Sequence, residues 1–105
     1  PGNRRLASMS TLPPDQIAAR IGDGPWRLQD GTLVRDLELG DFAAAIALVN
    51  RVAGAAEAAN HHPDILVHGW NGVRFTLSTH SEGGVTEADL ALAATIDALV
   101  TESHA

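Results

Sequence analysis

Two dipeptides, Asp30-Gly31 and Asn71-Gly72, constrain the fold of this 105-residue chain more than any other feature. Each separates two strand-like runs, and both are preferred in two-residue β-hairpin turns because such turns need positive φ. The sequence predicts four strand runs that form two hairpins, at residues 26–29 with 32–39, and 65–70 with 73–79. Apolar and polar residues alternate in the last run, so we expect one sheet face to be buried and the other polar.

Helical patterns precede, separate and follow the hairpins. Pro14 and Asp15 favour a helix start, and Gly22 ends that short helix. A second helix opens after Gly40-Asp41 and is expected to end near Asn60 or His61, since Pro63 disfavours helical geometry just before it. The segment Thr86-Glu87-Ala88-Asp89 resembles a capping box with Asp in place of Glu, which predicts the start of a last helix.

The order helix, hairpin, helix, hairpin, helix predicts an α+β domain, in which a four-stranded antiparallel sheet carries three helices on one face. Apolar residues at helical spacing predict the buried faces of the second and last helices. For these helices we expect buried Phe42, Ile46, Val49 and Ala53, and buried Leu92, Ile96 and Leu99. Gly54 is interpreted as a sign of close backbone packing.

Composition excludes several classes of protein. A length of 105 residues suits one domain. The net charge of −6 argues against direct binding to nucleic acid or to an anionic membrane, since both need a basic face. Without cysteine there are no disulfides, catalytic thiols or thiolate metal ligands, and we expect a cytoplasmic protein. We find no signal peptide and no apolar run that we expect to span a bilayer.

The start of the chain is unusual because the only methionine, Met9, follows eight residues that include two arginines. We interpret residues 1–10 as a flexible arm or an expression scar, with a native start near Met9. A true basic tail is the competing interpretation. The single domain is then expected to cover residues 11–105.

Histidines and a carboxylate mark the candidate site. Glu57 lies one helical turn before His61, which is followed by His62 and Pro63, and His80 ends the second hairpin. Glu57 and His61 are expected to share a helix face, where the carboxylate and the helix dipole both favour imidazolium. Imidazoles that titrate near neutrality suit acid/base catalysis, with His80 as a second group.

Other interpretations of these residues stay open. A histidine at a helix end is often a cap or a solvated side chain, and His68 and His104 have no pattern that suggests more. A metal site is disfavoured, because the adjacent His61 and His62 would not readily bind one ion. Nucleophilic catalysis by a serine beside His80 lacks the strand-Ser-helix elbow.

Taken together, these residues resemble the pterin-4a-carbinolamine dehydratases. The motif of that family is an acid, three residues, His-His-Pro, an aromatic, a second histidine nine residues beyond it and a downstream Asp. The matching residues here are Glu57, His61-His62-Pro63, Trp70, His80 and Asp89. The Leu-Ser-Thr-His and Gly-Gly-Val-Thr-Glu-Ala-Asp segments are also similar, and the resemblance extends from Leu12 to Leu99.

The resemblance implies a hydro-lyase that removes water from 4a-hydroxytetrahydropterin and gives quinonoid dihydropterin, with no cofactor and no metal. It implies acid/base roles for His61 and His80, in an order left open, and substrate contact by His62. Glu57 would orient or charge His61, while Asp89 would cap a helix or support the site. Other residues implied around the substrate are Pro63, Trp70, Ser78 and Thr79. A homodimer or homotetramer is also implied.

One departure from the family pattern affects the aromatic position. Some relatives carry an aromatic two residues after the proline, where this chain has Ile65, and one residue fewer before the turn. The position of Trp70 and the stacking of the pterin are therefore left open. A non-catalytic dimeric binding or assembly module is the alternative function. A protein-interaction role alongside catalysis is a third.

Overall fold

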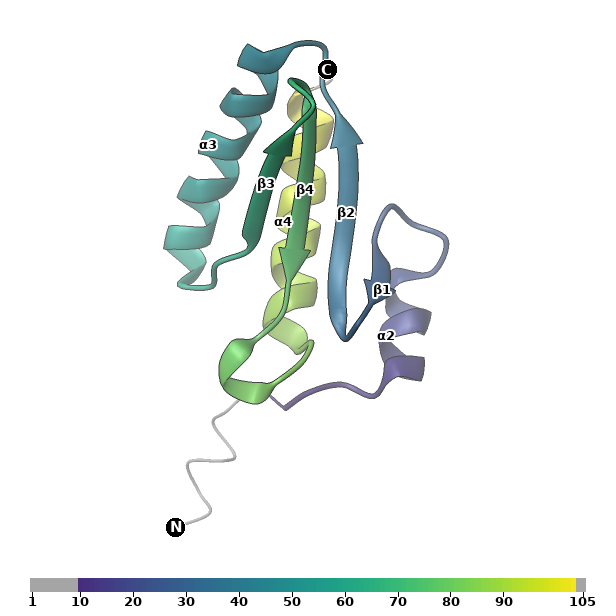
Figure 1. Cartoon of the computed structure of the whole chain (residues 1–105). Coiled ribbons are helices and arrows are strands. Elements are labelled where there is room, and N and C mark those ends of the chain that lie inside the picture. Colours follow the sequence, from purple (N-terminus) through teal and green to yellow (C-terminus); the bar gives the residue numbers. More distant parts are fainter. Residues whose placement is uncertain (1–9, 104–105) are drawn as a thin grey trace.

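The computed structural model describes residues 10–103, and they form an α+β domain (Figure 1). The elements along the chain are α2 (Pro14–Ile21), β1 (Arg27–Gln29), β2 (Thr32–Glu38), α3 (Phe42–Ala59), β3 (Asp64–His68), β4 (Gly72–Leu77), the 3₁₀ turn η1 (His80–Glu82) and α4 (Glu87–Ser103). The predicted fold class and element order are confirmed. The interpretation of the first residues as an arm or scar falls on residues that, up to Met9, lie outside the described range.

The four strands form one antiparallel sheet in the order β1-β2-β4-β3. The two hairpins therefore join through β2 and β4, and β3 is an edge strand. Asp64 at the start of β3 pairs with Thr76 near the end of β4. This register brings the segment before β3, which holds two of the candidate histidines, to the same end of the sheet as the segment after β4, which holds the third.

One face of the sheet is apolar and covered by helices. Val73, Phe75 and Leu77 alternate along β4 and are fully buried, and they belong to one core cluster with residues of α3 and α4. On the opposite face of β4, Arg74 and Thr76 are half-buried. The alternation predicted for this strand is confirmed, and α2 adds Ile17 to the core beside β1.

The buried face of α3 differs from the prediction. The residues that it buries are Ala45, Leu48, Val52 and Ala56. Phe42 is 55% exposed, and Ala53 and Gly54 are also exposed. A Cβ added at Gly54 would meet no atom within 4 Å, so close packing does not explain this glycine. The helix is apolar on nearly every side, and its periodicity therefore could not distinguish the face that packs on the sheet.

The composition of α3 also corrects the expectation that no apolar run could span a bilayer. Its 18 residues have a mean hydropathy of 1.3, which is enough by length and composition alone. In this domain α3 packs along the sheet (Figure 1), although only 22% of its residues are buried.

The first hairpin turn is where the sequence predicts it, and the second is not. Asp30 and Gly31 have φ of 52° and 76°. In the second hairpin the positive φ values fall on Gly69 and Trp70, while Gly72 already pairs with His68 in the sheet. A Cβ on Gly72 would lie 2.9 Å from the carbonyl oxygen of His68. This glycine therefore permits a close approach of two strands rather than a turn.

Asn71 has a different role from the one predicted. Its side-chain amide donates to the carbonyl of Leu39 at 2.8 Å, and its own carbonyl accepts from the Leu39 amide at 2.9 Å. These two bonds tie the hairpin to the end of β2. The Asn-Gly pair is thus used for contact between strands, and the turn moves toward Gly69.

Candidate functional site

The backbone at the end of α3 determines the directions in which the adjacent residues His61 and His62 lie. Asn60 closes the helix in the left-handed conformation with φ of 51°, which asparagine tolerates better than most residues. The backbone amide of His61 still donates to the carbonyl of Ala56 at 3.1 Å. Because the chain reverses at Asn60, His61 turns back toward the start of α4, and His62 leads into β3. The predicted helix end is confirmed.

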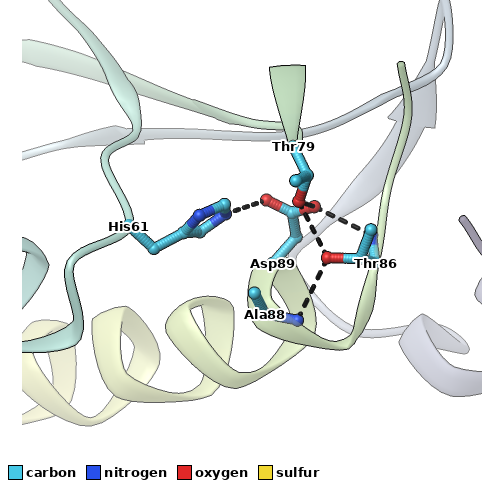
Figure 2. Close-up of polar contacts among 5 residues, drawn as sticks. All are labelled: His61, Thr79, Thr86, Ala88 and Asp89. Carbon is cyan, nitrogen blue, oxygen red and sulfur yellow. Dashed lines mark hydrogen bonds and ion pairs between the residues drawn. The ribbon is translucent and has the colours of Figure 1, made fainter. Parts of the chain in front are cut away.

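His61 contacts a buried carboxylate, as Figure 2 shows. Its Nε2 lies 2.5 Å from Oδ1 of Asp89. The His61 side chain is 16% exposed and the Asp89 side chain is fully buried. A carboxylate without solvent needs hydrogen-bond donors to remain ionised, and an imidazole is one such donor.

Two further donors satisfy the other oxygen of this carboxylate. The Thr79 hydroxyl and the Thr86 backbone amide each donate to Oδ2 of Asp89 at 2.9 Å. The Thr86 hydroxyl lies 2.8 Å from that of Thr79 and accepts from the Ala88 amide at 3.2 Å. The capping box is confirmed, with Asp89 accepting from the Thr86 amide, and the same carboxylate contacts His61.

The hydrogen bonds around Asp89 are consistent with one arrangement of protons (Figure 2). Since the Thr79 proton goes to Asp89, the Thr79 oxygen accepts from Thr86, whose own oxygen accepts from Ala88. Oδ2 of Asp89 is then an acceptor. With Asp89 ionised, Nε2 of His61 donates to Oδ1, and Nδ1 is the ring nitrogen that stays free.

The partner predicted for Glu57 is wrong. Its carboxylate contacts His62, with 2.5 Å between Oε2 and Nε2, and not His61. Helical spacing suggested the pairing with His61, but the reversal at Asn60 carries that ring away from the helix face. Both partners are open to solvent, with the His62 and Glu57 side chains 56% and 77% exposed.

His80 lies at the same end of the sheet as His61 and His62, one residue beyond Thr79. It is exposed, and with Ser78 it lines a hollow of about 200 Å³ that also borders the turn at Asp30 and Gly31. His61 lines a different, more apolar hollow of about 270 Å³ between α3 and α4. The three imidazoles therefore lie at one end of the sheet, but neither of these two hollows is lined by both His61 and His80.

The other residues implied around the substrate divide into two groups. Pro63 is half-buried between His62 and the start of β3, at the same end as the histidines. Trp70 is 63% exposed in the β3–β4 turn, at the opposite end of β3. Within one copy of the chain, Trp70 does not join the histidines, and it does not pack on the sheet either.

Sequence reasoning missed a second polar cluster. Asp97 of α4 accepts from Nε1 of Trp26 at 2.7 Å and forms an ion pair with Arg35 of β2. This cluster fastens α4 to the first hairpin, and no local motif reveals it. Among residues 10–103, no three His, Asp or Glu side chains converge as a metal ion would require.

The chain is similar to proteins of one family. The model of the pterin 4 alpha carbinolamine dehydratase family matches residues 10–99. Two bacterial relatives, both provisionally named pterin-4-alpha-carbinolamine dehydratase, have similar lengths. A protein of Acidobacterium capsulatum is 48% identical over 88% of this chain and 100% of its own length. A protein of Nocardia farcinica is 51% identical over 84% of this chain and 93% of its own.

Two solved structures are also similar. A transcriptional coactivator/pterin dehydratase from Brucella melitensis matches with a TM-score of 0.79 and 31% identity, over 86% of this chain and 98% of that one. A pterin dehydratase-like protein described as a RuBisCO assembly factor in the alpha-carboxysome matches with a TM-score of 0.60 and 31% identity. That match covers 73% of this chain and 90% of the other.

Proposed function

The chain belongs to the pterin 4 alpha carbinolamine dehydratase family, and on this premise we propose that it dehydrates 4a-hydroxytetrahydropterin by histidine acid/base catalysis. In this reaction the C4a–O bond breaks and the hydroxyl leaves as water after protonation. The N5 proton passes to a base, and a C4a=N5 double bond forms. The reaction thus needs one proton donor and one acceptor, and His61 and His80 are proposed for these roles.

The observation that best supports the proposal is the contact between His61 and the buried Asp89. An ionised carboxylate on Nε2 holds the ring in place and fixes which nitrogen is free, as the aspartate does in catalytic triads. The bonds from Thr79 and Thr86 to the other oxygen of Asp89 hold this carboxylate in place beside the ring. His62, held by Glu57, is proposed to contact the substrate, together with Pro63 and Ser78.

The decisive experiment is a stopped-flow assay of 4a-hydroxytetrahydropterin decay at neutral pH. We expect the protein to accelerate the decay, and we expect His61→Ala and His80→Ala each to lower kcat by roughly 10²-fold or more, as for removal of an acid/base group. His68→Ala is the matched control, because His68 is exposed at the far end of β3. If His61→Ala and His80→Ala behave like the control while folded, the assigned roles are wrong.

An assembly or binding role is the second candidate, and the similarity to the RuBisCO assembly factor favours it specifically. The two proposals differ in their dependence on the histidines. If wild-type protein leaves the decay of the pterin unchanged, we would prefer the assembly role. The cytoplasmic location expected from the cysteine-free sequence stays a prediction, which cell fractionation would test.

We also propose that the chain forms a homodimer or homotetramer. Among residues 10–103, three large apolar side chains are more than half exposed, namely Phe42, Leu66 and Trp70. The outer edge of β3 pairs with no strand of the described chain, and unpaired edges and apolar patches are common features of interfaces. Light scattering coupled to size exclusion would measure the mass, and a monomer at micromolar concentration would refute this part.

A further inference from the structure

The Asn71-Gly72 pair has a chemical reactivity that neither the hairpin turn nor the candidate site uses. When glycine follows asparagine, the glycine nitrogen readily attacks the asparagine side-chain amide, because no side chain hinders the approach. The other three asparagines of the chain precede Arg4, Arg51 and His61, whose side chains hinder it. Asn71 is therefore the asparagine at which this reaction is fastest in the unfolded chain.

The reaction replaces the side-chain nitrogen of Asn71 with oxygen. The Gly72 nitrogen loses its proton and bonds to Cγ of Asn71, the Cγ–Nδ2 bond breaks, and ammonia leaves with that proton. Water then opens the cyclic imide at one of its two carbonyl groups. The product is aspartate, or isoaspartate with the main chain passing through Cγ. One negative charge is added, and water is the only co-reactant.

The fold holds the Asn71 side chain away from this reaction. Its Nδ2 donates to the Leu39 carbonyl at 2.8 Å, and the Leu39 amide donates to the Asn71 carbonyl at 2.9 Å. Ring closure needs the side chain to turn onto the Gly72 nitrogen, so the bond from Nδ2 must break first. The side-chain amide therefore stays beside the end of β2 for as long as these two segments remain together.

The attacking nitrogen is restrained as well. Gly72 is buried, and it pairs with His68 of β3 on one side and with Glu38 of β2 on the other. The His68 ring lies against it, since a Cβ added at Gly72 would be 2.8 Å from Cε1 and 3.0 Å from Nε2 of that ring. Movement of the Gly72 nitrogen toward Asn71 thus requires the end of the β3–β4 hairpin to open.

The same contacts determine what the modification would change. An aspartate at position 71 has no side-chain proton to donate to the Leu39 carbonyl, and two oxygens would face each other there. Isoaspartate would add a main-chain carbon between the turn and β4. In either form the bond from Nδ2 to Leu39 cannot re-form, so the modified hairpin is held less firmly to the end of β2.

We propose that Asn71 is a modification site that is closed in the folded protein and open in the unfolded chain, so that its conversion to aspartate or isoaspartate marks irreversibly the chains that have unfolded. A group protected in this way reacts through the open population, and its rate follows the fraction of open molecules. The proposal does not depend on the dehydratase function, because Asn71 lies at the opposite end of β3 from His61 and His62.

The test follows the modification of wild-type protein by peptide mass mapping, at mildly alkaline pH and over a series of urea concentrations. We expect the rate at Asn71 to be at least about tenfold lower in buffer than in concentrated urea, and to rise along the unfolding transition measured by circular dichroism. A rate in buffer equal to that in urea would show that the fold does not close the site. No modification in either condition would also overturn the proposal.

Two variants with the same change of charge test the structural consequence. Asn71→Asp reproduces the aspartate product, whereas Asn50→Asp makes the same change at an exposed position of α3. We expect Asn71→Asp to lower the urea midpoint of unfolding by roughly 0.5 M and Asn50→Asp to leave it nearly unchanged. Equal midpoints would show that only net charge matters and would overturn the assigned consequence. The urea series uses wild-type protein alone, so it decides whether the site is closed even if Asn71→Asp does not fold.

Discussion

Two adjacent histidines at the end of α3, His61 and His62, each contact a carboxylate, and the two nitrogen–oxygen distances are the same. His61 to Asp89 and His62 to Glu57 both measure 2.5 Å. The first pair is nearly solvent-free, and its carboxylate has two other donors. The second pair is exposed and has no further hydrogen bond among the described residues. Distance alone therefore does not distinguish a buried pair within a hydrogen-bond network from a surface contact, whereas burial and the surrounding donors do.

This difference follows from where each carboxylate originates. Asp89 belongs to the first turn of α4, where the Thr86 amide and the Thr79 hydroxyl bond to the oxygen that does not face His61. Glu57 extends from the last turns of α3 into solvent, and an exposed ion pair of this kind contributes at most about 1 kcal/mol. We therefore expect the first pair to control the chemical step and the second to influence substrate affinity.

The largest effect that separates the two pairs is expected from Asp89→Asn. The asparagine oxygen can still accept from Thr79 and Thr86, so its amide group faces His61. An amide donor there requires the unprotonated form of Nε2, which moves the proton to Nδ1 and removes the free nitrogen. We expect kcat to fall by roughly 10²-fold or more, by the same logic as the tautomer change in serine proteases. Stopped-flow kinetics on folded protein measure it.

The matched variant is Glu57→Gln, which makes the same chemical change in the exposed pair. Here we expect kcat to remain within about threefold, because water replaces the lost contact. KM should rise several-fold if His62 holds the substrate. A comparable loss of kcat in Glu57→Gln and Asp89→Asn would contradict the distinction between the pairs.

A smaller effect is expected from Thr86→Val, which removes the hydroxyl between Thr79 and Ala88. Loss of this helix-cap bond should lower the free energy of unfolding by about 1–2 kcal/mol. The Thr79 hydroxyl then loses its donor, and we expect kcat to fall by about tenfold because Asp89 is held less firmly. Urea unfolding and the dehydration assay measure the two effects separately.

Two other variants show whether the hydroxyl itself matters. Thr86→Ser keeps it and should restore both quantities most of the way. Thr95→Val removes a hydroxyl that bonds only to the Ala91 carbonyl on the exposed side of the same helix. It should change stability by less than about 0.5 kcal/mol. If Thr86→Val and Thr95→Val have equal effects on kcat, the network around Asp89 does not position His61.

The sequence predicted correctly those features whose geometry is determined within one short segment of the chain. Spacing alone identified the capping box from Thr86 to Asp89, and Pro63 located the end of α3 to within a residue. The Asp30-Gly31 turn formed as predicted, since both residues tolerate positive φ without help from distant parts. These features depend on neighbours in the chain.

The sequence-based predictions were wrong where contacts between elements far apart in the chain determine the local structure. The Asn-Gly pair at residue 71 suits a turn, but bonds to Leu39 and the approach of His68 moved the turn to Gly69 and Trp70. The partner of His61 comes from α4, 28 positions away, and no local spacing could select it over Glu57. The apolar surface of α3 similarly gave no indication of which side would meet the sheet.

The smallest effect is expected from Glu87→Gln, which compares two acids within one turn of α4. Glu87 is exposed, and the hydrogen bond from Arg20 holds its pKa below the usual range. A lowered pKa in the folded state means that the ion pair stabilises the protein above the usual carboxyl pKa, and that this contribution is lost as pH falls through the lowered value. The stability difference between wild type and Glu87→Gln should therefore be greatest near neutral pH, diminish on acidification and shrink in high salt.

Urea unfolding at a series of pH values would measure it, while kcat at pH 7 should not change because Glu87 does not contact the His61–Asp89 pair. A difference that persists in acid or a large loss of kcat would mean that Glu87 belongs with Asp89, and that burial is not what separates the acids at this helix start.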